Sequence, residues 1–143
     1  MELKVKFFDS LTTRELYEIL KIRTAVFVVE QECPYPEVDG TDYDALHVWL
    51  EEDGEIKAYL RAFPKGENTV QIGRVLSAQR GIGLGGKIIR AGIEAVKEKL
   101  PCQRIYIEAQ TYALAFYEKV GFVTAGEEFL EDGIPHTPMT LEM

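Results

Sequence analysis

Four glycines within six residues, Gly81, Gly83, Gly85 and Gly86, form the segment with the clearest chemical meaning. An apolar stretch ends at Leu76 before them, and a helical pattern follows them. Such a turn exposes backbone N–H groups at the positive end of a helix, where a diphosphate is a common occupant. Arg80, directly before the glycines, adds a cation. The segment therefore predicts an anion-binding loop, since a plain turn needs only one or two glycines.

Two phosphate-binding patterns compete for this loop. Gly81-x-Gly83-x-x-Gly86 matches the dinucleotide fingerprint, and Glu108 stands 22 residues further on, close to the expected place of a ribose-binding acid. A doubly wound nucleotide fold, however, has its loop after the first strand and continues in repeated strand–helix–strand units. Only 57 residues follow Gly86, and an antiparallel stretch precedes the loop. This context disfavours a dinucleotide site.

Other side chains capable of catalysis are sparse. The two histidines, His47 and His136, and the two cysteines, Cys33 and Cys102, show no metal-ligand spacing and no recognisable Cys–His arrangement. We therefore expect neither a metal site nor a cysteine nucleophile. Each histidine also fits the simpler role of a hydrogen-bonded packing residue.

The elements that position the loop follow from periodicity and turn residues. Thr12 and Glu15 form a capping box at the start of a helix that follows a strand over residues 2–8. Strands are expected over 46–51, 55–63, 69–76, 104–109, 122–130 and 136–142, with turns at Asp53-Gly54, 64–68 and 131–133. The glycine loop opens a helix that stops at Pro101, and a short helix covers 112–119. The strand–helix–strand order across the loop predicts a parallel pair in a mixed sheet.

Length and composition bound the class of protein. The chain has 143 residues, 46% of them hydrophobic, and a formal charge of −8 with a pI near 4.8. This fits a single domain over residues 1–143. An acidic surface disfavours a nucleic-acid partner, and no apolar run reaches the roughly 20 residues that span a membrane. With no signal-peptide pattern and no disulfide pattern, we expect a reduced, cytoplasmic protein.

Two motifs, in this order, resemble the GNAT acetyltransferases. Arg80-x-x-Gly83-x-Gly85, between a strand and a helix, is similar to the acetyl-CoA signature of that family. Residues 113–122, Ala-Leu-Ala-Phe-Tyr-Glu-Lys-Val-Gly-Phe, are similar to its A-x-x-(F/L)-Y-E-K-x-G-F segment. Segments 27–31, 33–35, 38–40 and 131–136 narrow the resemblance to the ElaA-like branch, over essentially the whole chain. The implied fold is α/β (α+β): a mixed, mostly antiparallel central sheet with a splayed parallel strand pair and flanking helices.

The resemblance implies an N-acetyltransferase that uses acetyl-CoA and in which an amine attacks the thioester directly. Tyr117 matches the general acid of the family, and Gln110 stands where the family often has Asn. The residues expected to bind the coenzyme are Arg74, Val75 and Leu76 through their backbone, Arg80, Gly81, Ile82, Gly83, Leu84, Gly85 and Gly86 in the loop, Gln110 and Phe116. A non-catalytic CoA-binding module on the same fold is the alternative.

The general base and the acceptor stay open at this point. Glu108, His47 and His136 are candidate bases, beside Glu30 and Glu37. The first helix, the loop 31–44 and the hairpin should form the acceptor pocket, with Arg23, Gln31, Glu37 and Arg61 as candidate contacts. Arginines, Arg74 included, would favour an acceptor with a carboxylate, whereas the acidic loop would favour a polyamine or another cationic amine. We expect a small-molecule or peptide amine as partner; an exposed edge strand or apolar face would allow a homodimer.

Overall fold

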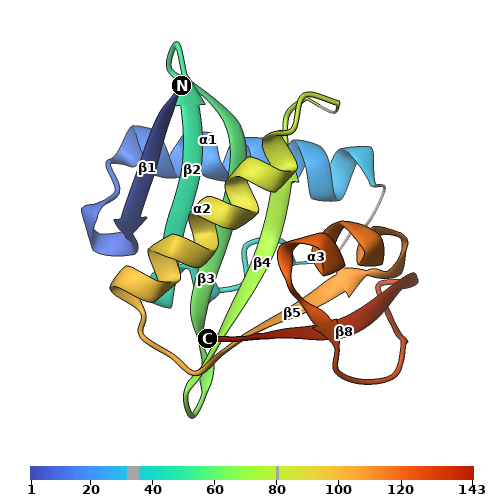
Figure 1. Ribbon diagram of the computed structural model, residues 1–143. Helices are drawn as coiled ribbons and strands as arrows, with labels where there is room; N and C mark the ends of the chain where they lie inside the picture. The colour runs from blue at the N-terminus through green and yellow to red at the C-terminus, as the bar shows by residue number, and fades with distance from the viewer. Residues whose placement is uncertain (32–35, 80) are drawn as a thin grey trace.

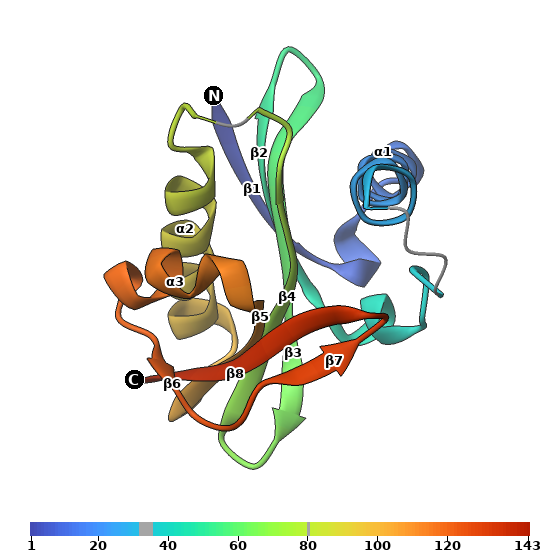
Figure 2. The same ribbon diagram turned by 90° about the vertical axis from the view of Figure 1, so that its right-hand side faces the viewer.

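The computed structural model describes residues 1–31, 36–79 and 81–143, and its strands join in one sheet (Figures 1 and 2). The strands are β1 (Glu2–Phe7), β2 (Leu46–Glu52), β3 (Glu55–Gly66), β4 (Thr69–Ser77), β5 (Arg104–Gln110), β6 (Val123–Thr124), β7 (Phe129–Glu131) and β8 (Ile134–Glu142). The helices are α1 (Thr13–Arg23), α2 (Leu84–Lys99) and α3 (Leu114–Val120). A π-helical segment, η2 (Thr24–Glu30), extends α1, and short 3₁₀ turns are η1 (Phe8–Ser10), η3 (Thr41–Asp44) and η4 (Thr111–Ala113).

The sheet has the order β1-β2-β3-β4-β5-β8-β6, with β7 paired to β8. Neighbouring strands are antiparallel except β4 and β5, which run parallel on either side of the connection through α2. Helix α1 lies on one face of the sheet, and α2 and α3 cover the other (Figure 2). The predicted fold class, including the parallel pair, is confirmed.

Local signals placed several element ends correctly. The capping box at the start of α1 is formed: Glu15 N donates to Thr12 Oγ1 at 3.0 Å, and Thr12 N donates to Glu15 Oε1 at 2.9 Å. Two hairpins turn at Asp53-Gly54 and Asp132-Gly133, where both residues of each pair have positive φ. Aspartate tolerates this conformation and glycine takes it without steric cost, which is why these pairs predicted the turns.

Two predicted boundaries were wrong. Pro64 is part of β3 rather than of the following turn, and it pairs with Val70 of β4. The pairing of β2 with β3 reaches only as far as Ala62 of β3. Pro64 therefore has no partner strand on that side, where a missing N–H is tolerated. The expected strand over residues 122–130 is split into β6 and β7, because the chain leaves the sheet at 125–128. Ala125 N still donates to Pro138 O at 2.8 Å, which keeps this excursion against β8.

The parallel ladder between β4 and β5 is short. It joins residues 69–72 of β4 to 104–107 of β5, and beyond Ile72 and Ile107 the two strands continue without pairing to each other. Strand β4 stays paired to β3, and β5 stays paired to β8. The strands therefore diverge, as the resemblance implied.

Apolar residues on both faces of the sheet form the core. The larger cluster lies under α2 and α3, with Ile88 and Ile89 of α2 fully buried against the sheet. A smaller cluster under α1 contains Trp49 and Tyr59, both fully buried. Within the described residues, no helix combines the length and the apolar character needed to cross a bilayer.

At Gly92, α2 packs tightly on β3. A Cβ atom there would stand 2.5 Å from Cδ2 of the fully buried Leu60. We expect Gly92→Val to lower the free energy of unfolding by about 1–3 kcal/mol, the usual cost of overpacking a core. Urea denaturation followed by circular dichroism measures this. The control is Gly66→Val, at an exposed site with nothing within 4 Å. Equal stability of the two variants would contradict close packing at Gly92.

Candidate active site

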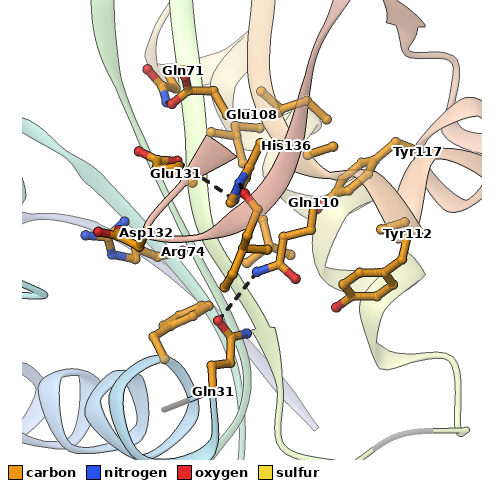
Figure 3. Close-up of a pocket in the computed structure, with 18 residues that line it drawn as sticks. Gln31, Gln71, Arg74, Glu108, Gln110, Tyr112, Tyr117, Glu131, Asp132 and His136 are labelled. Atoms are coloured by element: carbon orange, nitrogen blue, oxygen red, sulfur yellow. Dashed lines mark hydrogen bonds and ion pairs between the residues drawn. The ribbon is translucent and has the colours of Figure 1, made fainter. Parts of the chain in front are cut away.

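A cavity of about 240 Å³ opens where β4 and β5 stop pairing (Figure 3). Its walls come from the end of the β4–β5 ladder and the diverging parts beyond it, from η2 and the residue after it, from the start of the α3 region and from the β7–β8 hairpin. The lining residues are Phe27, Gln31, Gln71, Ile72, Gly73, Arg74, Val75, Ile107, Glu108, Ala109, Gln110, Tyr112, Ala113, Tyr117, Glu131, Asp132, Ile134 and His136. The splayed strands therefore enclose a site.

A β-bulge shapes the β4 wall of this cavity. Arg61 pairs with Gly73 while Tyr59 pairs with Leu76, so β4 carries one residue more than β3 between these pairs. Arg74, within the bulge, has φ of 52°, in the left-handed region. A bulge bends its strand and strengthens the local twist, which directs β4 away from β5. Of the three residues predicted to bind the coenzyme through their backbone, Arg74 and Val75 line the cavity, together with Gly73, whereas Leu76 packs under α1 and does not line it.

Strand β5 places polar groups on the α1 side of the sheet. Ile107 and Ala109 point into the core under α2, so Glu108 and Gln110, which alternate with them, face the other way. Gln110 Nε2 donates to Gln31 Oε1 at 3.4 Å, which joins β5 to the segment after η2 (Figure 3). Both glutamines line the cavity; the sequence predicted Gln110 as a coenzyme contact and Gln31 as an acceptor contact.

Tyr117 reaches the cavity from α3. Its ring meets Phe116 and Phe122 edge-on, with centroids 5.0 and 5.9 Å away. Burial, and to a smaller extent the neighbouring Tyr112, raise the pKa of Tyr117 to about 12. The phenol therefore keeps its proton at neutral pH. Figure 3 shows the two tyrosines on one side of the cavity, across from Glu131 and Asp132.

The glycine loop leads directly into α2 beside α3. Gly81 and Gly83 have φ of 83° and 78°, and a Cβ at either would find nothing within 4 Å. Gly83 caps α2 without a side-chain hydrogen bond, so no side chain of the cap occupies the first-turn amides. Gly85 faces the Phe116 ring, 3.6 Å from an added Cβ. Exposed Ile82 and buried Leu84 complete the loop, and Arg80 lies outside the described residues.

Two candidate bases, Glu108 and His136, line the cavity. The Glu108 carboxylate accepts from Gln71 Nε2 and from the Tyr106 hydroxyl, both at 3.2 Å. Burial, with the nearby carboxylate of Glu108, raises the pKa of Tyr106 to about 12. His136 Nδ1 bonds to the Ile134 carbonyl at 2.8 Å, and its Nε2 stands 3.8 Å from Glu131 (Figure 3).

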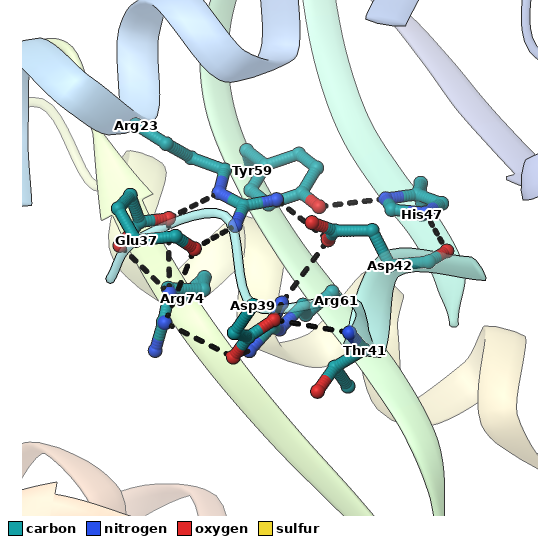
Figure 4. A network of polar contacts seen from close by, with 9 residues as sticks. All are labelled: Arg23, Glu37, Asp39, Thr41, Asp42, His47, Tyr59, Arg61 and Arg74. Carbon is teal, nitrogen blue, oxygen red and sulfur yellow. Dashed lines mark hydrogen bonds and ion pairs between the residues drawn. The ribbon is translucent and has the colours of Figure 1, made fainter. Parts of the chain in front are cut away.

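Beside the cavity lies a network of three arginines and three carboxylates: Arg23, Arg61, Arg74, Glu37, Asp39 and Asp42 (Figure 4). Arg23 Nε contacts Glu37 at 2.6 Å, and Arg23 Nη1 contacts Asp42 at 2.6 Å. Arg61 binds Asp39 at 2.9 Å and Asp42 at 3.1 Å. Although burial alone would raise the pKa of the Asp42 carboxyl, hydrogen bonds and charges from Arg23 and Arg61 lower it.

This network corrects several sequence predictions about the acceptor pocket. Arg23 and Arg61 are 0% and 3% exposed and Glu37 is 6% exposed, and none of the three lines the cavity. His47 is fully buried, with Nδ1 2.7 Å from the Tyr59 hydroxyl and Nε2 3.1 Å from the Asp42 carbonyl (Figure 4). Burial lowers the pKa of His47, and the imidazole is a packing residue rather than a base in the cavity.

Sequence reasoning missed the carboxylates of the β7–β8 turn. Glu131 and Asp132 were predicted only as turn residues, yet both line the cavity. Gln71, Tyr112 and Phe27 also reach it from separate elements. The turn residues carried no signal for this, because their place beside β5 depends on β8 pairing with β5.

The described residues provide no group of three or more His, Cys, Asp or Glu side chains arranged to hold a metal ion. Cys102 is partly buried, and burial raises the pKa of its thiol, whereas Cys33 lies outside the described residues. The cavity is instead lined by amide, carboxylate and phenol side chains together with apolar residues, many of them from β4 and β5. Such a set suits an extended, hydrogen-bonding ligand.

Comparisons with known proteins agree with this geometry. The model of the acetyltransferase (GNAT) domain matches residues 13–143. The UPF0039 protein C11D3.02c of Schizosaccharomyces pombe is 41% identical over 147 residues, covering 100% of this chain and 98% of that protein. A crystal structure of an acyl-CoA N-acyltransferase from Pseudomonas aeruginosa has a TM-score of 0.93 and 40% identity, covering 99% of both chains.

The structure of Escherichia coli ElaA also has a TM-score of 0.93, at 36% identity, and covers 99% of this chain and 100% of that one. These three relatives are each identical to this chain at over a third of the aligned residues, and the two solved structures have its fold. The chain belongs to the GNAT acetyltransferase family, in its ElaA-like branch.

Proposed function

We propose that this chain is an N-acetyltransferase that uses acetyl-CoA and that residues 1–143 act as one domain. The observation that carries the proposal is the cavity between diverging β4 and β5, bordered by Tyr117. The glycine loop lies near this border, since a Cβ added at Gly85 would stand 3.6 Å from the ring of Phe116, the residue before Tyr117. A coenzyme bound on the loop would thus have its reactive end beside a phenol, with room for an acceptor.

The residues present fit a CoA molecule. Backbone N–H groups from Gly81 to Gly86, at the start of α2, would bind the pyrophosphate, as helix N-termini do. The edges that β4 and β5 turn toward each other beyond the ladder would bond the pantetheine amides as they would a neighbouring strand. Arg74 and Val75 supply this edge on β4, and Gln110 supplies it on β5.

Acetyl-CoA supplies a thioester whose C–S bond breaks as the acceptor nitrogen forms the new C–N bond. The Val75 N–H would polarise the carbonyl in this step. Tyr117, which holds its proton at neutral pH, would donate it to the departing sulfur. Before the attack, the acceptor ammonium would lose a proton to the Glu108 carboxylate or to the His136 imidazole, which share the cavity, so that its nitrogen has a free electron pair.

The charges around the cavity favour an acceptor that is cationic. The arginines and the acids of loop 36–44, which had suggested opposite acceptors, are paired with each other. Glu108 instead has only neutral donors, Gln71 and Tyr106, among the described residues, and Glu131 lies on the same cavity. We infer an amine, small-molecule or peptide, with a second positive charge near Glu108.

Coenzyme binding is the first test. Saturating acetyl-CoA should raise the free energy of unfolding by about 2.7 kcal/mol at a hundredfold excess over Kd, and Gly83→Glu should abolish this gain. Gly54→Glu is the matched control, because Gly54 has φ of 77° against 78° at Gly83 and both sites are open. Thermal unfolding with and without ligand measures both. No gain in the parent protein at millimolar acetyl-CoA would refute the proposal.

Tyr117→Phe separates catalysis from binding. Loss of the general acid should lower kcat by about a hundredfold or more, while the Kd for acetyl-CoA stays nearly the same, because the ring remains packed on Phe116 and Phe122. Steady-state kinetics and calorimetry give the two values. Tyr17→Phe, at an exposed site on α1, controls for the loss of a phenol. Undiminished turnover would remove Tyr117 from the mechanism, and a protein that binds acetyl-CoA but acetylates no amine would be the non-catalytic module.

The acceptor charge is tested with 1,4-diaminobutane and butylamine. We expect the diamine to have the higher kcat/KM, and Glu108→Gln to reduce this preference by about tenfold, the value of one hydrogen bond to a charged group. Glu52→Gln removes the same formal charge from the end of β2, outside the cavity walls, and should keep the preference. If Glu108→Gln keeps the full preference for 1,4-diaminobutane over butylamine, this carboxylate does not bind the second positive charge of the acceptor.

A further inference from the structure

Arg74 adopts a backbone conformation that its residue type disfavours. Among the described residues other than glycine, positive φ occurs at Asp53, Asn68, Arg74 and Asp132. Three of these are Asp or Asn at turns, which tolerate the left-handed region through their short polar side chains. Arg74 has a long side chain and stands inside a strand, where φ is 52°. Such a residue persists only where its surroundings hold it in place.

The side chain of Arg74 is held by the buried network. Its Nε lies 2.8 Å from Glu37 Oε1 and 3.0 Å from Oε2, and its Nη2 lies 3.4 Å from Asp39 Oδ2 (Figure 4). Both carboxylates come from loop 36–44, more than thirty residues before Arg74 in sequence.

Glu37 is itself fixed from the other side. Its carboxylate binds Arg23 Nε at 2.6 Å, and Arg23 Nη2 donates to the Glu37 carbonyl at 2.9 Å. The Glu37 side chain is 5% exposed and that of Arg23 is 0% exposed. Arg74 is therefore tied through Glu37 to Arg23 of α1, a helix none of whose residues lines the cavity.

The conformation of Arg74 decides where its neighbours lie. Gly73 and Val75, on either side of it, both line the cavity, and the bulge is the point at which β4 has left the ladder with β5. A change of φ at this residue from the left-handed to the extended region would turn the Val75 amide and realign the edge that faces β5.

We propose that Glu37 and Asp39 are positioning residues, which hold the guanidinium of Arg74 and thereby keep the β4 bulge in its left-handed conformation. They act through Arg74 and touch neither coenzyme nor acceptor. This inference rests on the proposed function, since the bulge supplies the backbone that would bind the coenzyme. In this proposal the ion-pair network both holds loop 36–44 and maintains the backbone of the coenzyme site at the β4 bulge.

Two substitutions at Arg74 separate the backbone from the guanidinium. Arg74→Ala removes the tether and keeps the steric cost of a Cβ in the left-handed region, whereas Arg74→Gly removes the tether and that cost together. We expect the alanine variant to bind acetyl-CoA about tenfold more weakly, the scale of a strained backbone residue, and the glycine variant to recover most of this loss. Isothermal titration measures both Kd values.

Equal losses in the two variants would overturn the proposal, because the guanidinium would then act on the ligand directly. Full affinity in Arg74→Ala would overturn it as well. Asn68 provides the matched control, since its φ of 55° lies in the β3–β4 turn outside the cavity walls. Asn68→Ala and Asn68→Gly should bind acetyl-CoA alike.

The carboxylates are tested through Asp39→Asn, because the Asp39 side chain is 30% exposed, whereas the Glu37 side chain is 5% exposed against the fully buried Arg23 and its neutralisation endangers folding. Asp39→Asn should weaken acetyl-CoA binding in the parent protein and have no effect in the Arg74→Gly background, where there is no tether to lose. An equal effect in both backgrounds would contradict a role through Arg74.

A readout without ligand keeps this inference distinct from the proposed function. The ¹H–¹⁵N resonance of Val75 should move in Arg74→Ala and return toward its parent position in Arg74→Gly. If the parent protein binds no acetyl-CoA, the proposed function fails, while this resonance still tests the tether. If binding is found but the resonance moves alike in both variants, the tether fails alone.

Discussion

The parallel ladder between β4 and β5 is four residue pairs long, and the candidate site depends on where it ends. Had the ladder continued, the backbone groups of both strands would bond to each other, and the cavity between them would be closed. The bulge at Arg74 bends β4 at this point, while β5 stays straight in its long pairing with β8. The divergence thus leaves the facing edges of β4 and β5 without a neighbouring strand, and in the proposed complex the coenzyme would bond to them.

Charge pairing explains why the cavity wall that contains Glu108 and Glu131 is acidic although three arginines lie nearby. Arg23 and Arg61 are buried against Glu37, Asp39 and Asp42, and each group is costly to bury alone. The pKa values of Asp39 and Asp42 are low because the arginine contacts outweigh the effect of burial. With these charges matched, the carboxylates that line the cavity are Glu108, Glu131 and Asp132. The same pairing connects loop 36–44 to the strand that carries the bulge.

Most of the fold and part of the site could be predicted, because their signals are local. The capping box at Thr12, the Asp53-Gly54 turn and the parallel pair around α2 appear in the structure as predicted. Predictions failed where an element's end depends on its neighbours, as at Pro64, whose place in β3 depends on how far β2 extends. In the same way, His47 could serve as base or as packing residue on its own sequence, and its contacts with Tyr59 and Asp42 assign the second role.

The sequence by itself determined the glycine loop, the order of strands and helices and the motif that contains Tyr117, because turn chemistry and hydrophobic period act over a few residues. Tertiary structure alone decided which charges meet. Glu37 contacts Arg23 at a separation of 14 residues and Arg74 at one of 37, and Glu131 reaches the cavity only because β8 lies on β5. A carboxylate gives no sign in sequence of whether an arginine will neutralise it, since that depends on chain reversals that bring distant segments together. The acidic wall of the cavity and the tethered bulge are therefore properties of the folded chain.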